Sequence, residues 1–76
     1  MKTDEMKYVV GRNIQRLREK SGKTKSDLSA SIGMSRKFWD DVENGNKEAS
    51  ISSLERIATA LAVTVSDLTE EPSKRR

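Results

Sequence analysis

The placement of glycine and proline points to short helices more strongly than any other feature of this sequence. Proline is absent until Pro72 and runs of β-branched residues are scarce, so helices meet no obvious breaker before the end of the chain. Gly22, Gly33 and Gly45 separate stretches whose apolar residues follow helical spacing, as glycines at helix ends do. The pattern predicts an all-α fold in a single domain.

The first helix is expected from about residue 4 to residue 20 or 21. Val10, Ile14 and Leu17 recur at helical spacing and would form its buried stripe. Gly11 lies inside this helix, where glycine costs about 1 kcal/mol relative to alanine. Either the helix begins later than residue 4, or another backbone packs closely against Gly11.

Two short helices separated by a glycine are expected next. Thr24 with Asp27 three residues later resembles a capping box that opens the second helix, and Gly33 ends it. Ser35 is a good N-cap for a third helix over about residues 36–44. Two short helices around such a turn form the helix-turn-helix pattern.

The rest of the chain predicts two more helices. Ser50 would cap the fourth, and Thr64 with Asp67 suggests a capping box that opens a short fifth. The domain is expected to cover residues 1–69, and the polar segment 70–76 is expected to be disordered. The apolar residues expected in these two helices are Ile51, Leu54, Ile57, Ala58, Leu61, Val65 and Leu68.

Composition argues against catalysis and metal binding. The 76 residues include no cysteine and no histidine, which removes disulfides, thiolate metal sites and the commonest general base. Asp40 and Asp41 are adjacent, so on a helix they diverge by about 100° and do not converge on one substrate. We therefore expect no enzyme, no metal and no cofactor. No apolar stretch approaches the roughly 20 residues of a membrane span, and the polar N-terminus is unlike a signal peptide, which favours a cytoplasmic location.

Charge is distributed unevenly along the chain. Between Arg12 and Lys37 eight basic residues stand against Glu19 and Asp27, whereas between residues 48 and 71 Arg56 alone stands against five acidic residues. A basic half joined to an acidic half suggests one side that faces a polyanion. The alternative is ordinary solvated helix surface.

The sequence resembles the phage repressor and Cro family of helix-turn-helix proteins over nearly its whole length. The resemblance implies a compact five-helix, lambda-repressor-like domain that places its third helix in the major groove of DNA. It also implies a homodimer on a palindromic operator and a bacterial or phage origin. The matching residues, in family order and spacing, are Ile14, Leu17-Arg18, Gly22, Thr24, Leu28, Ile32-Gly33, Met34-Ser35-Arg36, Val42-Glu43-Asn44-Gly45, Ser50, Leu54, Ile57-Ala58, Leu61, Val63 and Asp67-Leu68.

The chain departs from the family pattern at four positions. Lys25 replaces the glutamine that usually opens the second helix, and Ser29 replaces a small alanine within it. Ala49 stands where a proline often precedes the fourth helix. Trp39 occupies the aliphatic core position of the third helix and should enlarge the core locally.

Helical geometry selects the candidate base contacts. At 100° per residue, Trp39, Val42 and Glu43 share the face of the cap, whereas Lys37, Asp40, Asp41 and Asn44 point to the other side. In a docked helix-turn-helix the N-terminal end of the third helix meets base edges. We expect base contacts from Arg36 to guanine, from Asp41 to cytosine N4 and from Lys37. The alternative is that Arg36–Asp40 and Lys37–Asp41 are plain surface pairs.

Other residues around the third helix are expected to contact phosphates. They are Lys25 at the start of the second helix, Ser35 at the cap, and Asn44 and Lys47 beyond the third helix. For Lys25 the alternative is a solvated lysine. Phe38 lies on the flank, where it either touches a thymine methyl or packs against the second helix.

In the resembling family, the positions of Arg18 and Glu43 form an ion pair between the first and third helices. Each residue also lies at the edge of its helix's apolar stripe, which agrees with a partly buried pair. The sequence as a whole predicts a sequence-specific double-stranded DNA-binding regulator, expected to act as a repressor. The alternative is a protein-interaction module on the same scaffold, such as an antitoxin or anti-repressor, because the exposed side of the third helix carries two positive and two negative charges.

Overall fold

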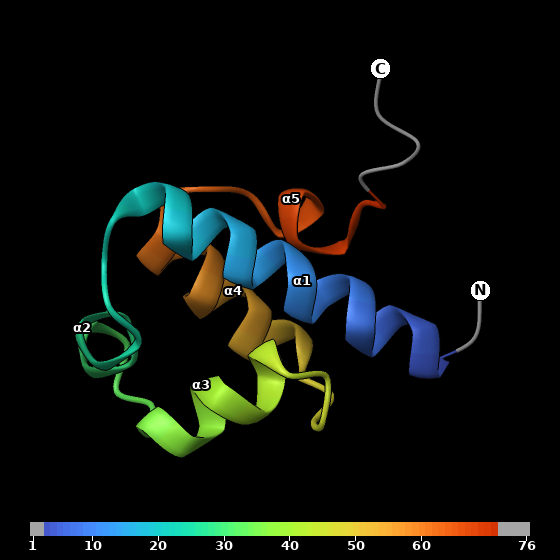
Figure 1. Cartoon of the computed structure of the whole chain (residues 1–76), viewed down its shortest axis with the longest axis horizontal. Coiled ribbons are helices and arrows are strands. Elements are labelled where there is room, and N and C mark those ends of the chain that lie inside the picture. Colours follow the sequence, from blue (N-terminus) through green and yellow to red (C-terminus); the bar gives the residue numbers. More distant parts are fainter. Residues whose placement is uncertain (1–2, 72–76) are drawn as a thin grey trace.

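The computed structural model describes residues 3–71 of the 76-residue chain, and every regular secondary-structure element in that range is a helix (Figure 1). In chain order they are α1 (Thr3–Ser21), α2 (Lys25–Ser31), α3 (Arg36–Glu43), α4 (Ile51–Leu61) and α5 (Val65–Thr69). The predicted all-α, five-helix fold is confirmed. The expected bounds of the first and third helices differ from the observed ones by about one residue, the usual uncertainty of helix ends.

Hydroxyl side chains begin the four shorter helices, because each satisfies an amide of the first turn that has no partner within the helix. The capping side chains accept from the amide three residues on, at 3.0–3.1 Å, and they belong to Thr24, Ser35, Ser50 and Thr64. The carboxylate of Asp67 also accepts from the Thr64 amide, at 3.0 Å, which completes the predicted capping box of α5.

The ends of α2, α3 and α4 turn through left-handed backbone conformations. Gly33 and Gly45 have φ of 69° and 77°, which glycine adopts without steric cost. Both glycines were predicted from the sequence to separate helices. Ala62 ends α4 with φ of 60°, so this turn is made without glycine.

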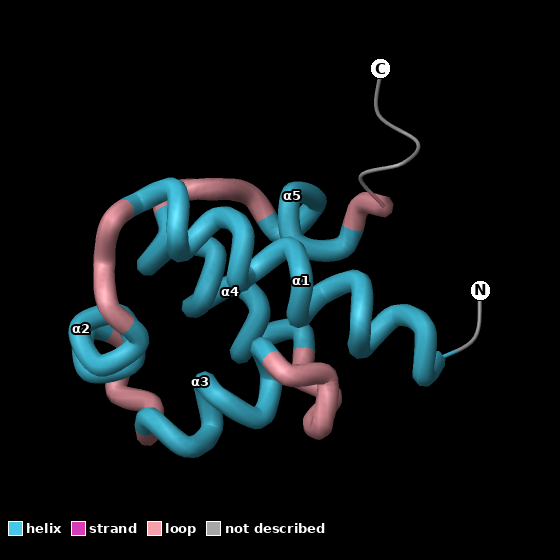
Figure 2. The backbone as a smooth tube through the Cα atoms, in the orientation of Figure 1, coloured by secondary structure: helices cyan, strands magenta, loops and turns pink. Residues whose placement is uncertain are grey.

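All five helices contribute side chains to one hydrophobic core, and Figure 2 shows how their backbones are arranged. The two longest helices, α1 and α4, pass close to each other, while α1 also packs against α3 and α5. Because every helix contributes a fully buried side chain, the helix-turn-helix cannot shift without disturbing the core. These side chains are Ile14, Leu28, Trp39, Ile57 and Leu68, from α1 to α5 in order, and each is at most 2% exposed.

Gly11 lets α1 approach the end of α3. A Cβ at this position would overlap the backbone carbonyl oxygens of Val42 and Glu43. The helix begins well before Gly11, so the second of the two explanations offered by the sequence, close backbone packing, applies. The contact fixes the distance between α1 and α3 and thereby helps to position α3.

The segment after α5 lies against α1. The side-chain amide of Asn13, which is fully buried, donates to the carbonyl oxygens of Leu68 and Glu70, at 2.8 Å each. Glu70 and the half-buried Glu71 were expected in a disordered tail, but the structure places them beside α1. Residues 72–76, the rest of that expected tail, lie outside the described residues.

Two structural features are absent from residues 3–71. None of the helices in this part of the chain has the length and apolar character that crossing a membrane would require. The same residues include no group of three or more acidic side chains placed to hold a metal ion.

Candidate nucleic-acid interface

The helix-turn-helix unit comprises residues 24–44. Its turn is stabilised by a hydrogen bond within the unit and by another from α4. The amide of Met34 donates to the carbonyl oxygen of Ser29 at 2.9 Å, which closes the chain after α2. The guanidinium of Arg56, on α4, donates to the carbonyl oxygen of Ile32. These contacts fix the turn between α2 and α3. Sequence reasoning missed this role of Arg56, which stood out only as the single cation among the acidic residues of the C-terminal half.

The two sides of α3 differ in burial. Trp39, Val42 and Glu43 point inward and are at most 6% exposed. Arg36 and Lys37 lie on the outer side and are exposed. Figure 1 shows α3 at the edge of the molecule, with α2 beside its start. The face that the sequence assigned to base contacts is therefore accessible along the first turn of α3.

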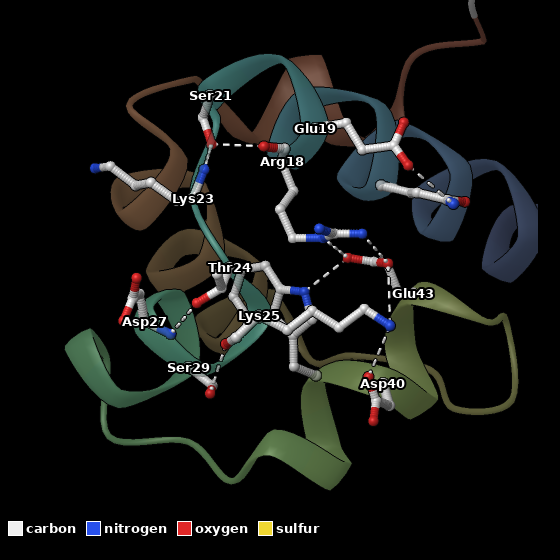
Figure 3. A network of polar contacts seen from close by, with 12 residues as sticks. Arg18, Glu19, Ser21, Lys23, Thr24, Lys25, Asp27, Ser29, Asp40 and Glu43 are labelled. Carbon is white, nitrogen blue, oxygen red and sulfur yellow. Dashed lines mark hydrogen bonds and ion pairs between the residues drawn. The ribbon is translucent and has the colours of Figure 1, made fainter.

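The inner side of α3 carries a buried carboxylate with several donors. Arg18 Nε and Nη2 lie 2.7 and 3.2 Å from the two carboxylate oxygens of Glu43 (Figure 3). Trp39 Nε1 donates to the same carboxylate at 2.8 Å, and Lys25 Nζ lies 3.8 Å from it. The hydrogen bond to Glu43 raises the pKa of Arg18, against the opposing effect of burial. The structure thus brings together the Arg18 and Glu43 side chains that the resemblance paired.

The outer side of α3 pairs cations with carboxylates. Asp40 Oδ1 lies 3.0 Å from Lys25 Nζ and 3.6 Å from Arg36 Nε, while Lys37 Nζ lies 3.5 Å from Asp41 Oδ2. The ammonium of Lys25 holds the pKa of Asp40 below its usual value. The three expected base contacts are therefore on the outer side, each engaged in an ion pair within the protein.

The residues expected to contact phosphates lie around α3 in different settings. Ser35 and Asn44 are exposed at its two ends, roughly 13 Å apart along the helix axis. Lys47 is exposed, with its Nζ 5.6 Å from the centre of the Phe38 ring. Phe38 itself is half-buried and packs against the core. Lys25 is more constrained than expected, because it lies between the carboxylates of Asp40 and Glu43.

Two further contacts of the site were not foreseen. The indole N–H of Trp39 binds Glu43, although the sequence was interpreted only as placing Trp39 in the core. The i, i+4 spacing of the two residues, with the rule that a buried indole N–H finds an acceptor, could have revealed it. The hydroxyl of Ser26 accepts from Arg36 Nη1 at 3.3 Å, and no sequence signal pointed to this contact between α2 and α3.

Comparison with known proteins identifies the family and the fold of the chain. Residues 9–71 match a family described as a helix-turn-helix domain. Control protein C.MunI from a Mycoplasma species is 29% identical over 72 residues, which cover 93% of this chain and 97% of that protein. A hypothetical transcription factor, NHTF from Neisseria, has a TM-score of 0.87 at 24% identity and covers 99% of this chain and 87% of its own. The restriction-modification controller protein C.AhdI from Aeromonas hydrophila has a TM-score of 0.83 at 24% identity and covers 90% and 99%.

The family match spans the chain from the middle of α1 to the segment after α5, so it includes the whole helix-turn-helix unit. The solved structures share the fold over nearly the entire chain. The predicted resemblance to repressor and Cro-type proteins is thereby confirmed. The chain belongs to the helix-turn-helix domain family and is a DNA-binding transcriptional regulator.

Proposed function

We propose that the protein acts as a repressor that reads an operator by placing α3 in the major groove. The observation that carries this proposal is the division of α3 into a buried side and an outer side with Arg36, Lys37 and Asp41. The major groove of B-DNA is about 12 Å wide and admits such a helix. The first turn of α3, which carries two of these residues, would enter it first.

Arg36 is the principal base contact in this proposal. It is 58% exposed in its side chain, and its ion pair with Asp40 is long, at 3.6 Å. Exposed pairs contribute about 0–1 kcal/mol, so this contact does not prevent the guanidinium from binding a partner on DNA. Arg36 would bind guanine O6 and N7, while Asp41 would accept from cytosine N4 and Lys37 would contact a neighbouring acceptor.

Phosphate contacts would come from both sides of α3. Ser35 and Asn44 mark its two ends, Lys47 follows it, and Lys25 lies beside it at the start of α2. Such contacts set the register of the helix on the duplex without reading sequence. Replacing Lys47 by alanine should weaken binding to every duplex and reduce the log–log salt slope by about 0.9.

We further propose that two copies bind a palindromic operator. Half-sites read by helix-turn-helix dimers lie about 34–36 Å apart, one turn of the double helix. The two shorter extents of the Cα trace, 24 and 18 Å, are well below this spacing and leave room for the side chains of two copies on one face of the duplex. The two-fold arrangement is supported by the resemblance to repressor and Cro-type proteins.

Selection of bound duplexes from a random pool tests these proposals together. We expect one enriched sequence with two-fold symmetry and half-sites one helical turn apart. Amide chemical shifts recorded during titration with that duplex should change first within residues 24–47. Shifts confined to residues 51–68 would contradict docking through α3.

A protein-interaction module on the same scaffold is the second candidate. The pairing of Lys25, Arg36 and Lys37 with carboxylates favours it, because a paired cation attracts phosphate less strongly. Salt dependence separates the two functions. A steep fall in duplex affinity with rising salt supports phosphate binding, whereas indifference to salt supports a protein partner.

A further inference from the structure

Asp40 lies near two cations, one at the start of α2 and one at the start of α3. Its Oδ1 atom is 3.0 Å from Lys25 Nζ on α2 and 3.6 Å from Arg36 Nε, one turn earlier on α3. The side chains of Asp40 and Lys25 are 33% and 27% exposed. This half-buried carboxylate therefore connects a predicted phosphate contact with a predicted base contact.

The direction from which Asp40 meets Arg36 leaves part of the guanidinium available. The carboxylate approaches Nε, and Ser26 Oγ accepts from Nη1 at 3.3 Å. A guanidinium is planar and has five donors in a fixed fork. Contacts with Asp40 and Ser26 restrict the orientation of this plane but leave donors on both Nη atoms. These donors can reach guanine O6 and N7 while Asp40 keeps hold of Nε.

The same carboxylate lowers the attraction of this surface for DNA of any sequence. Asp40 neutralises Lys25, and its negative charge lies close to where a phosphate bound by Lys25 would come. Non-specific binding depends almost entirely on unpaired cations that displace counterions from phosphates. Recognition of a base by an arginine depends on hydrogen-bond geometry as well as on charge. Asp40 supports this geometry, because it restricts the orientation of the Arg36 guanidinium.

We propose that Asp40 is a specificity-determining positioning residue, an inference that rests on the proposed reading of bases by Arg36. It orients Arg36 toward a base edge and withholds the charge of Lys25 from DNA of arbitrary sequence. Withholding Lys25 lowers the affinity for every duplex alike, whereas the orientation of Arg36 widens the difference between the operator and all other duplexes.

Asp40→Asn tests the proposal, because asparagine keeps the size of the side chain and removes its charge. Binding is measured by fluorescence anisotropy for the duplex enriched from the random pool and for a random-sequence duplex of equal length. For Asp40→Asn we expect random-duplex affinity to rise about threefold, with a salt slope steeper by about 0.9, as one more cation becomes available. The ratio of the two affinities should fall about tenfold, the lower end of what one bidentate base contact contributes.

Two further variants and a folding measurement separate the effect of the carboxylate at position 40 from effects of net charge and of folding. Glu55→Gln changes the net charge equally on α4, outside the ion pairs of α3, and should leave the ratio unchanged. Asp40→Glu retains the charge and should restore the low affinity for the random duplex. Thermal unfolding of each variant, compared with the wild-type protein, shows that the binding data refer to folded protein.

The outcomes distinguish this inference from the proposed function. If the wild-type protein enriches a duplex but Asp40→Asn keeps the affinity ratio, the inference fails and the proposed function stands. An equal effect of Glu55→Gln would assign the change to net charge and also overturn the inference. If the wild-type protein enriches no sequence, both proposals fail.

Discussion

Two ion pairs on opposite sides of α3 show how burial changes the role of the same chemistry. On the inner side, Glu43 is 3% exposed in its side chain and binds both Arg18 and the indole of Trp39. On the outer side, Lys37 is 86% exposed and meets Asp41 at 3.5 Å. Water competes for the outer pair, so it contributes little to folding and leaves its members available to a ligand. Loss of one inner partner would leave a poorly solvated charge, so the inner pair holds the helix in place.

The pair of Lys25 and Asp40 lies between these extremes, with side chains 27% and 33% exposed. It is buried enough to restrict both side chains and exposed enough to face DNA. We infer that three degrees of burial around one short helix serve three functions. The inner pair fixes α3, while in the proposed function the intermediate pair would set the charge and direction of the binding residues and the outer pair would meet DNA.

The largest effect is expected from removing the inner carboxylate. Glu43→Ala leaves Arg18 with an uncompensated charge and Trp39 Nε1 without its acceptor. We expect a loss of about 3 kcal/mol in the free energy of unfolding, the lower end for breaking a buried pair. Chemical denaturation measures this loss, and Glu19→Ala, on the exposed side of α1, serves as the control. Equal unfolding midpoints for the two variants would contradict a structural role for the inner pair.

Arg36→Ala should show the reverse pattern on the outer side, with a large effect on binding and a small one on folding. Loss of the base contact should cost about 1–3 kcal/mol on the enriched duplex and relax preference for one base pair per half-site. The free energy of unfolding should change by only about 0.5 kcal/mol, since the ion pair with Asp40 is exposed. Anisotropy titrations with the enriched and random duplexes measure the first quantity. An equal loss on both duplexes would show that Arg36 contacts a phosphate instead.

Much of the difference between the two sides of α3 could be predicted from the sequence, because it depends on local rules. Helical periodicity assigned Trp39 and Val42 inward and Lys37 outward. Capping residues located the start of α3, which placed Arg36 at its N-terminal end. The i, i+4 spacing also anticipated the pairs Arg36–Asp40 and Lys37–Asp41. All of these relations depend on residues within one or two turns of a single helix.

Contacts between helices were harder to foresee, since they depend on crossing geometry that no local pattern encodes. Lys25 was expected to be available for phosphate, but α2 crosses α3 so that Lys25 meets Asp40 and Glu43. Asn13 gave no signal of its contact with the segment after α5, 55 residues away for Leu68. The Arg18–Glu43 pair, at a separation of 25 residues, was anticipated chiefly because the family resemblance supplied the missing geometry.

Trp39→Phe sharpens the contrast by removing one donor from the inner side while keeping an aromatic ring in the core. The variant loses the indole hydrogen bond to a charged carboxylate and part of the buried ring volume. We expect a loss of about 1–2 kcal/mol in the free energy of unfolding, less than for Glu43→Ala because Arg18 still pairs with Glu43. Chemical denaturation of both variants under the same conditions provides the comparison. A larger loss for Trp39→Phe would show that ring packing, and not the carboxylate, dominates the inner side.

The smallest effect is expected from the most exposed cation, Lys37. Lys37→Gln removes the pair with Asp41 while keeping a similar helix propensity, so the cost should be that of one surface pair, about 0.2–0.5 kcal/mol at low salt. Screening offers a sharper test than the magnitude, because the Debye length falls to about 3 Å at 1 M salt. The destabilisation by Lys37→Gln should therefore vanish at high salt, whereas that by Glu43→Ala should largely persist, since salt does not enter the buried site. Unfolding curves at low and high salt for both variants measure the difference. If salt removes both effects equally, the inner pair is as accessible to solvent as the outer one, and burial does not divide the two sides of α3.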